Sequence, residues 1–257
     1  MTEYGRFNTD QKALTKRIKA HDKYSLYDLN KWIFDQMSIE EGHSVLDLGC
    51  GTGKQTIPMA QLVGDKGHIL ALDVSQESLL ILSKRASNLK INKRISYLHC
   101  ELDDLQKHLH QETFDRVLSS YSIYYAQDPL KVIEVIHQAL KPGGIFFFCG
   151  PAKDNNLELR RFHYALLKQP VPAEETGTFM EEISPKMTRA FFGNIEIVRF
   201  QNPLHFDSPE ALYNYWSSYN LYKEKLDATF KARAKKHFQT HPTFETIKRV
   251  IGVKATR

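Results

Sequence analysis

A nine-residue segment, VLDLGCGTG at residues 45–53, constrains the fold of this 257-residue chain more than any other part of its sequence. An apolar strand that runs directly into Gly49, Gly51 and Gly53 is typical of a strand-to-helix turn whose backbone approaches a ligand closely. A dinucleotide fingerprint would need its third glycine at position 54, which is Lys54, and a Walker A loop is also absent. The loop therefore predicts a nucleotide-like ligand but disfavours both a nicotinamide dinucleotide and a nucleoside triphosphate.

Strand-like and helix-like segments alternate after residue 40, which sets the fold class. The predicted strands are 44–49, 68–75, 94–101, 115–122 and 144–150, and the predicted helices between them are 54–63, 76–89 and 128–140. Ser75 is a suitable N-cap, and Asp128 followed by Pro129 is a typical helix start. The alternation predicts an α/β fold with a doubly wound, mostly parallel sheet, helices on both faces, and ligands at the carboxyl ends of the strands.

The second half of the chain is less regular. We expect a helix at 156–168, a loop at 169–179, a sixth strand at 193–201, helices at 209–222 and 223–239, and a seventh strand at about 245–256. This gives a seven-stranded sheet whose last strand is antiparallel, with a helical insertion before that strand. The predicted domains are an N-terminal helical cap at 1–40 and a Rossmann-like domain at 41–257, in which residues 202–242 form a helical lid.

Three acidic residues follow or end the first three predicted strands. Asp47 precedes the glycines, Asp73 ends the second strand, and Glu101 follows the third. A carboxylate at Asp47 would repel a pyrophosphate but suits a ligand that carries an ammonium and a sulfonium. The acidic set therefore favours a cationic nucleoside over a phosphorylated one.

Four motifs together resemble the class I S-adenosylmethionine-dependent methyltransferases of the small-molecule type. They are VLDLGCGTG at 45–53, LALDVS at 70–75, FDRVLSSYSIYYAQDP at 114–129 and LKPGGIFFF at 140–148. The resemblance covers about residues 25–150 in order and at the family's spacing. It implies a Rossmann-like fold, S-adenosyl-L-methionine as cofactor and methyltransferase activity, but it says little about the acceptor.

The resemblance also implies which residues contact the methionine part of the cofactor. The backbone around Gly49, Cys50 and Gly51 would pass along it, and Asp47 would lie near its ammonium group. Ser119, at the end of the fourth strand, would touch the same part, although a plain position at a core strand end is the alternative.

On the adenosine side, the resemblance implies that Asp73 holds the ribose hydroxyls and that Val74 lies against the adenine. Glu101 would accept from the adenine amine, and the amide of Leu102 would donate to a ring nitrogen. The family more often has Asp at the position of Glu101. Either the longer Glu side chain reaches the amine or Asp103 substitutes for it, unless Asp103 acts only as an N-cap.

Methyl transfer from a sulfonium is an in-line displacement, so alignment and exclusion of water matter more than a catalytic motif. A general base is needed only if the nucleophile arrives protonated. The fourth strand lacks the (D/N)PP(Y/F) motif of amino-methylating nucleic-acid and glutamine enzymes and has Ser119-Ser120-Tyr121-Ser122 instead. A small-molecule acceptor, methylated on oxygen, nitrogen or carbon, is therefore the prediction.

Candidate acceptor residues lie after the fourth strand and in the second half of the chain. Tyr121 is the preferred acceptor contact, although it and its neighbours Tyr124 and Tyr125 could simply pack in the core. His205 ranks ahead of His163 as a candidate base, and either could be only structural. The helix at 209–222 could close over the acceptor as a lid.

The charge distribution leaves other functions open. The formal net charge is +5, and residues 223–257 hold ten Lys and Arg against three Asp and Glu. Such a segment is most often a solvated helix face, but it also permits an RNA methyltransferase. A non-catalytic S-adenosylmethionine-binding or regulatory protein and an NAD-dependent oxidoreductase are the remaining alternatives.

Cysteine usage and hydropathy predict the location of the protein. Cys50, Cys100 and Cys149 are an odd, widely spaced set, which favours free thiols over a disulfide framework or a metal site. No apolar run approaches the roughly 20 residues that cross a bilayer, and the first residues lack the apolar core of a secretory signal. We expect a cytoplasmic protein with no membrane or nucleic-acid partner.

Overall fold

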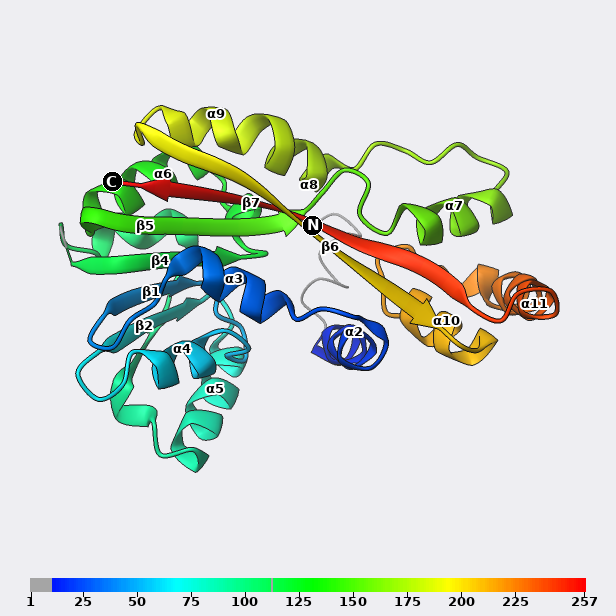
Figure 1. Ribbon diagram of the computed structural model, residues 1–257, viewed down its shortest axis with the longest axis horizontal. Helices are drawn as coiled ribbons and strands as arrows, with labels where there is room; N and C mark the ends of the chain where they lie inside the picture. The colour runs from blue at the N-terminus through cyan, green and yellow to red at the C-terminus, as the bar shows by residue number, and fades with distance from the viewer. Residues whose placement is uncertain (1–10, 112) are drawn as a thin grey trace. The chain divides into compact units, whose positions relative to one another are not determined.

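A seven-stranded sheet of order β3-β2-β1-β4-β5-β7-β6 is the central feature of the computed structural model, which describes residues 11–111 and 113–257 (Figure 1). The strands are β1 (Ser44–Leu48), β2 (His68–Asp73), β3 (Ile95–His99), β4 (Phe114–Ser120), β5 (Leu140–Pro151), β6 (Asn194–Phe206) and β7 (Phe244–Thr256). The first five strands pair in parallel, and β7 runs antiparallel to β5. The predicted fold class is therefore confirmed, including the antiparallel last strand.

Helices connect the strands where the sequence predicts them. The α-helices are α2 (Gln11–Tyr24), α3 (Leu29–Met37), α4 (Thr56–Leu62), α5 (Gln76–Asn88), α6 (Pro129–Ala139), α7 (Leu157–Leu166), α8 (Glu175–Thr178), α9 (Ser184–Arg189), α10 (Pro209–Trp216) and α11 (Asp227–Phe238). Short 3₁₀ turns are η1 (Asn92–Arg94), η2 (Leu102–Lys107), η3 (Ile123–Tyr125) and η5 (Glu224–Leu226), and η4 (Phe179–Ile183) is a π-helical turn. The Ser75 side chain caps α5, and the Asp128 carboxylate caps α6, whose first residue is Pro129. These helix starts are local, so the sequence alone predicts them.

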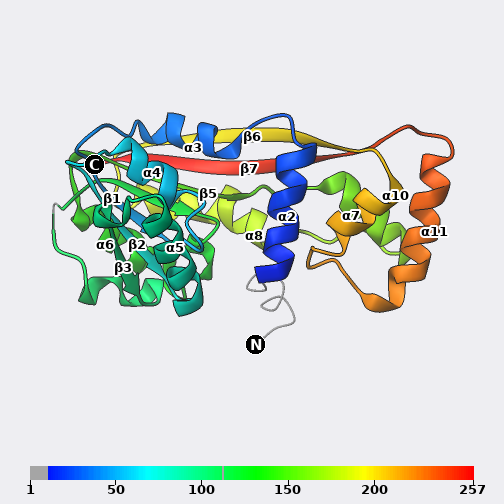
Figure 2. The same ribbon diagram turned by 90° about the horizontal axis from the view of Figure 1, so that it is seen from below.

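Two layers of helices enclose the parallel part of the sheet. Helices α3, α4 and α5 lie on one face and α6 and α9 on the other (Figures 1 and 2). On the first face, Ile33 and Met37 of α3 belong to the same buried apolar cluster as Leu82 of α5. On the second, Val132 and Ile136 of α6 pack with strands β4 and β5. Because both faces are covered, residues 45–48 of β1 and 146–150 of β5 are buried without interruption, as expected for strands of a parallel sheet.

The chain divides into two compact units. The sheet unit contains Leu29–Lys153, Glu174–Phe200 and Val250–Arg257, and the helical unit contains the described part of Met1–Asp28 together with Asp154–Ala173 and Gln201–Arg249. Strands β6 and β7 therefore contribute to both units. The predicted division at residues 40, 202 and 242 is a sequence-based proposal and is distinct from these structural boundaries.

The helical unit has its own aromatic core. Trp216 stacks on Phe230 with ring centroids 4.0 Å apart, and both side chains are fully buried. Two cations of α11 also lie over rings of this unit: Lys231 Nζ is 4.2 Å from the centroid of Tyr213, and Arg233 Cζ is 4.6 Å from that of Phe162. Part of the basic charge of residues 223–257 thus serves packing within the unit.

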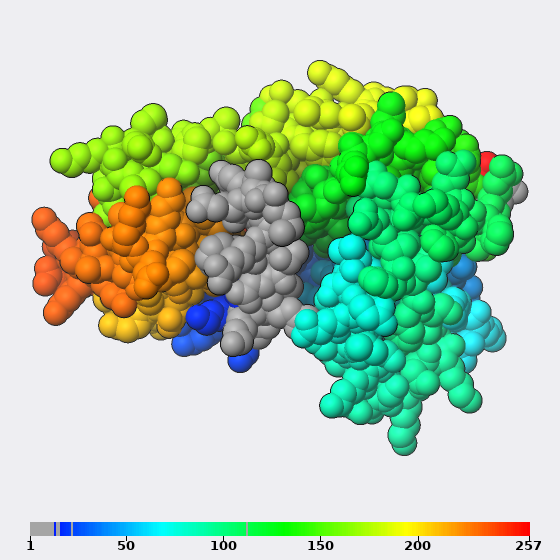
Figure 3. Space-filling view, turned by 180° about the vertical axis from the view of Figure 1, so that it is seen from behind, coloured from blue at the N-terminus to red at the C-terminus, as the bar shows by residue number. Residues whose placement is uncertain are grey.

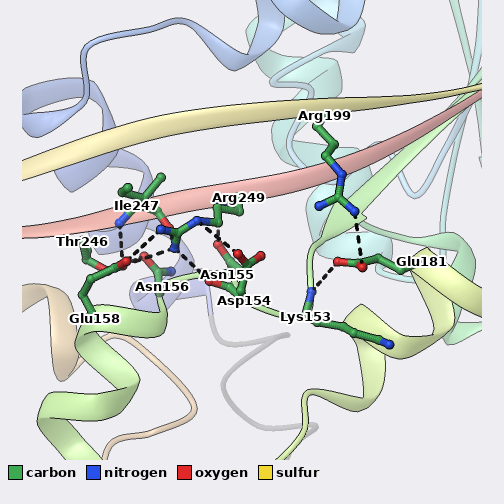
Figure 4. A network of polar contacts seen from close by, with 10 residues as sticks. All are labelled: Lys153, Asp154, Asn155, Asn156, Glu158, Glu181, Arg199, Thr246, Ile247 and Arg249. Carbon is green, nitrogen blue, oxygen red and sulfur yellow. Dashed lines mark hydrogen bonds and ion pairs between the residues drawn. The ribbon is translucent and has the colours of Figure 1, made fainter.

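Each unit also contains a polar network (Figure 4). In the helical unit, the guanidinium of Arg249 forms ion pairs with Glu158 (Nη2 to Oε1, 2.8 Å) and Asp154 (Nε to Oδ2, 3.3 Å). In the sheet unit, the carboxylate of Glu181 accepts from the backbone amide of Lys153 at 2.9 Å and from Arg199 at 3.5 Å. These networks fix the chain on the two sides of the boundary at residues 153 and 154.

Several sequence-based boundaries were wrong. Residues 175–178 of the predicted loop 169–179 are helical, and the predicted helix 209–222 ends at Trp216. Strand β6 continues to Phe206 rather than ending at residue 201. Part of the predicted N-terminal cap, residues 1–10, lies outside the described residues.

Candidate functional site

The three glycines of the VLDLGCGTG loop all have positive φ, but for different reasons. At Gly49 (φ +71°) an added Cβ would lie 2.3 Å from Cβ of Ser122, and at Gly53 (φ +86°) it would lie 2.2 Å from Cδ1 of Leu82. At Gly51 (φ +53°) no atom of the described residues, 11–111 and 113–257, lies within 4 Å of that position. Gly49 and Gly53 therefore allow close packing, and only Gly51 faces open space where a ligand could approach the backbone.

Asp47 lies inside the protein at the end of β1. Its side chain is 2% exposed, and its Oδ2 accepts a hydrogen bond from Thr56 Oγ1 at 2.6 Å. Burial raises the pKa of Asp47 to about 7; the bond from Thr56 lowers this pKa, and the nearby charge of Asp73 raises it. A cation near Asp47 would favour its ionised form, which suits the predicted role beside an ammonium group.

Cys50 is also buried, with 4% of its surface exposed. Burial raises the pKa of its thiol far above the ordinary value, and the charges of Asp47 and Asp73 raise it further. The side chain therefore stays a neutral thiol, and only the backbone of this residue is suited to a ligand.

Asp73, at the end of β2, is hydrogen-bonded to the glycine loop that follows β1. Its Oδ2 accepts from the amide of Gly51 at 2.7 Å, and its Oδ1 accepts from the amide of Ser75 at 2.8 Å. The amides of Gly49 and Cys50 both donate to the carbonyl of Leu72, one residue earlier on β2. The glycine loop and the end of β2 thus form one connected edge, which places the carboxylate of Asp73 beside the open position at Gly51.

The predicted adenine contacts lie at the next two strand ends. Val74 is 61% exposed, which is unusual for an apolar residue directly after a core strand, and its carbonyl oxygen is 3.0 Å from Nε2 of His99. Glu101 is exposed, and Leu102 is half-buried at the start of η2. An exposed apolar side chain after β2 and an exposed carboxylate after the neighbouring β3 fit an adenine ring and its amine.

Asp103 has a different role from either of those considered for it. Its two carboxylate oxygens accept from the backbone amides of Gln127 (3.0 Å) and Asp128 (2.8 Å). The side chain therefore connects the loop after β3 to the loop after β4 and is occupied by that contact. This leaves Glu101 as the better candidate for the adenine amine.

Ser119 is completely buried, and its Oγ lies 2.6 Å from Oγ of Ser122. The position therefore fits the alternative of a core strand end. A direct side-chain contact with the methionine part stays a prediction that this burial does not favour.

Tyr121 has an unusual backbone. Its φ is +60°, which is strained for a residue with a bulky side chain, and its amide donates to the carbonyl of Cys149 at 2.8 Å. Tyr124 packs beside Tyr125 with ring centroids 4.7 Å apart, and burial raises the pKa of Tyr124 well above its ordinary value. Tyr125 is 57% exposed. Strain at the end of a strand in this position is typical of functional segments, so Tyr121 remains a candidate acceptor contact.

The two histidines considered as bases belong to the helical unit. His205 lies within β6 rather than after it, and its Nδ1 is 3.4 Å from Oε2 of Glu245 on β7. His163 is 1% exposed, its Nδ1 accepts from Trp216 Nε1 at 3.2 Å, and burial lowers its pKa to about 4. His163 is thus a neutral core residue, whereas a catalytic role for His205 stays a prediction.

Sequence reasoning missed three residues that hold the glycine loop. Thr56 donates to Asp47, Arg85 Nη1 donates to the carbonyl of Thr52 at 2.6 Å, and Ser122 Oγ donates to the carbonyl of Leu48 at 2.5 Å. No motif signals them, because each acts through a tertiary contact. Figure 3 shows the part of the chain coloured cyan to blue-green, about residues 70–100, at the surface of the sheet unit.

Comparison with known proteins identifies the family of the chain. The model of the methyltransferase domain family matches residues 39–205, which is more than half of the chain. The chain therefore belongs to this family, and the resemblance to class I S-adenosylmethionine-dependent methyltransferases is confirmed.

Curated relatives are similar over part of their length. The demethylmenaquinone methyltransferase of Oceanobacillus iheyensis is 26% identical over 137 residues, 53% of this chain and 56% of that protein. The ubiquinone/menaquinone biosynthesis C-methyltransferase UbiE of Pasteurella multocida is 27% identical over 136 residues, 52% of this chain and 50% of that protein. The chain thus spans about half the length of these relatives.

Solved structures share the fold. An S-adenosylmethionine-dependent methyltransferase from Aquifex aeolicus has a TM-score of 0.58 at 15% identity, covering 95% of this chain and 96% of that one. The [4+2]-cyclase SpnF has a TM-score of 0.57 at 16% identity, covering 99% of this chain and 97% of that one. At such identities the likeness shows the fold alone.

The residues at this edge fit S-adenosylmethionine, the cofactor of this class. Gly51 is open, the carboxylate of Asp73 lies beside it, and Val74 and Glu101 are exposed at the following strand ends. Among the residues that the structure describes, no helix is long and apolar enough to cross a membrane.

Proposed function

We propose that this protein transfers the methyl group of S-adenosylmethionine to a small-molecule acceptor by in-line displacement. The single observation that carries the proposal is the connected edge of β1, β2 and β3, where an open Gly51 lies beside the carboxylate of Asp73. Family membership supports the same cofactor and reaction.

Each residue of the edge has a separate task in this proposal. The Gly51 backbone lies against the methionine part, and Asp47 supplies a buried negative charge for its ammonium. Asp73 accepts from the ribose hydroxyls while its bonds to the Gly51 and Ser75 amides hold it in place. Val74 covers the adenine, and Glu101 and the amide of Leu102 read its edge.

The bound cofactor supplies an already activated methyl group, so the protein has to align the acceptor and exclude water. We propose that the segment beginning at Tyr121 contacts the acceptor. A base is needed only for a protonated nucleophile, and His205 is the candidate for that task.

The acceptor class is part of the proposal. The names of the curated relatives make a carbon atom of a demethylmenaquinone-type acceptor the first to test, with oxygen and nitrogen acceptors next. A small-molecule acceptor also fits the missing (D/N)PP(Y/F) motif at Ser119–Ser122. We further propose a cytoplasmic location.

The experiment must detect the transfer itself, because the same fold occurs in a cyclase. The full chain is incubated with S-adenosylmethionine and a panel containing demethylated quinols, phenols and amines, and mass spectrometry follows both S-adenosylhomocysteine and a product 14 Da heavier than the acceptor. We expect both to appear in equal amounts with one acceptor class. Tight cofactor binding with no product across the panel would instead favour a non-catalytic binding protein.

A further inference from the structure

Ser122 occupies a junction between the first and fourth strand ends. It is 7% exposed, its Oγ donates to the carbonyl of Leu48 at 2.5 Å, and the same Oγ lies 2.6 Å from Oγ of Ser119. A hydroxyl has one hydrogen, and the Leu48 carbonyl can only accept. Ser119 must therefore be the donor in the pair of serines, which gives a buried chain of hydrogen bonds from Ser119 through Ser122 to Leu48.

On one side, this series of hydrogen bonds holds the glycine loop. Leu48 directly precedes Gly49, and Gly49 has room only for a hydrogen where it faces Ser122, since a Cβ would lie 2.3 Å from Cβ of Ser122. The amide of Gly49 in turn donates to the carbonyl of Leu72 at 2.8 Å. The contact with Gly49 and the hydrogen bond to Leu48 thus both fix the start of the loop relative to Ser122.

On the other side, Ser122 begins the turn that carries the tyrosines. Its carbonyl accepts from the amide of Tyr125 at 2.9 Å, and it directly follows Tyr121 with its strained φ of +60°. The side chain of Ser122 therefore holds the glycine loop while its backbone holds the tyrosine segment, defined here as residues 121–125. Neither segment can move far without the other.

We propose that Ser122 is a positioning residue that couples binding of the cofactor at the glycine loop to the conformation of the tyrosine segment. This inference rests on the proposed function, because it assigns the tyrosine segment to the acceptor side of the same site. Filling the loop would fix Leu48 and Gly49, and through Ser122 it would order the segment that contacts the acceptor. The acceptor would then meet an ordered segment only when the cofactor is present.

The test measures hydrogen exchange of the tyrosine segment with and without saturating S-adenosylhomocysteine, in the full chain. Three proteins are compared: the wild type, Ser122→Ala, and the matched control Ser120→Ala, whose hydroxyl lies 3.6 Å from Cys149 Sγ instead of on the loop. In the wild type and in Ser120→Ala, we expect the nucleoside to slow hydrogen exchange of the Tyr121 and Tyr125 amides by about tenfold. This is the effect expected when local opening of the segment has to break one additional hydrogen bond.

In Ser122→Ala, we expect the nucleoside still to bind at saturation while the slowing falls below about twofold. A merely structural role would weaken affinity or stability without removing the response at saturation. If Ser122→Ala does not fold, Ser119→Ala, which keeps the bond to Leu48 but removes the donor to Ser122, should reduce the slowing to an intermediate value.

Two results would overturn the inference while leaving the proposed function intact. One is a full response in Ser122→Ala, or in Ser119→Ala where that variant replaces it. The other is a wild-type segment that does not respond although calorimetry shows that the nucleoside is bound. Absence of binding to the wild type would instead contradict the proposed function itself.

Discussion

The two sides of the glycine loop differ in what their residues do. On the inner side, Gly49 and Gly53 pack against Ser122 and Leu82, and Asp47 is buried beneath the loop. On the outer side, Gly51 faces open space. The next two strands, β2 and β3, are followed by the exposed residues Val74 and Glu101.

One motif therefore combines two requirements. The inner side determines whether the loop can form, and the outer side determines what the loop can hold. Substitutions on the two sides should therefore separate folding from binding, and the following predictions test that separation.

The largest effect is expected for Gly49→Ala. The new Cβ would meet Ser122 at 2.3 Å in a left-handed backbone conformation, so we expect the free energy of unfolding to fall by about 3 kcal/mol or more. Gly51→Ala is the matched control, because its Cβ would meet no atom within the part of the chain that the structure describes. The strain of φ +53° then costs about 1 kcal/mol. Urea denaturation measures both, and equal losses of stability would contradict the assignment of sides.

The next effect concerns binding at Asp73. Asp73→Asn leaves one oxygen for the amides of Gly51 and Ser75 and for the ribose, so affinity for S-adenosylhomocysteine should fall by roughly 30-fold, about 2 kcal/mol. The control is Asp65→Asn. Asp65 precedes the first residue of β2, at the end opposite to Asp73, and its carboxylate forms an ion pair with Arg94. Isothermal calorimetry should find its affinity unchanged, and a loss shared by both variants would argue against a ribose site at Asp73.

The third prediction is a pH dependence caused by Asp47. With a pKa of about 7 in the free protein, Asp47 is mostly protonated at pH 6, whereas a cationic ligand favours the ionised form. Affinity for S-adenosylmethionine should therefore rise about tenfold between pH 6 and pH 8 and should level off above that. Asp47→Asn should flatten the profile, and an equally steep profile in that variant would show that another group titrates.

The same raised pKa has an effect on stability of the free protein. Between the ordinary pKa of 3.8 and about 7, the folded state binds more protons at Asp47 than the unfolded state. The contribution of this group to the free energy of unfolding therefore decreases as the pH rises through that range. Denaturation of the wild type and of Asp47→Asn at pH 5 and pH 7 gives the change of the free energy of unfolding with pH for each protein. The difference between these two changes is the contribution of Asp47.

The smallest effect separates two acidic neighbours after β3. Glu101→Gln should weaken S-adenosylhomocysteine binding by about fivefold, about 1 kcal/mol, with no change in stability, since Glu101 is exposed. Asp103→Ala should do the reverse and lower stability by about 1 kcal/mol, because it removes the acceptor of the Gln127 and Asp128 amides. The opposite pattern would mean that Asp103, not Glu101, reads the adenine.

The sequence predicts most of the sheet unit because its determinants are local. Ser75 and Asp128 cap helices by bonds that span three residues, and glycines at fixed spacing mark the turn after β1. The acidic residues at the strand ends follow from the parallel topology, which brings those ends to one edge. These features need no knowledge of distant contacts.

The rest depends on contacts between distant residues. The burial of Ser119 and the junction at Ser122 arise only when β4 pairs with β1. The bond from Ser122 to Leu48 joins residues that are 74 positions apart in the sequence. Likewise β6 extends past residue 201 through residues of mixed polarity, so its strand pattern is weak there and does not predict that His205 lies within the strand. Asp103 faces amides that lie more than 20 residues further on, which no local pattern announces.

The cofactor assignment is tested by isothermal calorimetry, in which the full chain is titrated with S-adenosylhomocysteine and, in parallel, with NADH. We expect one nucleoside site per chain that Asp73→Asn weakens and Asp65→Asn does not, and no binding of NADH. Binding of NADH with no heat from S-adenosylhomocysteine or S-adenosylmethionine would contradict it.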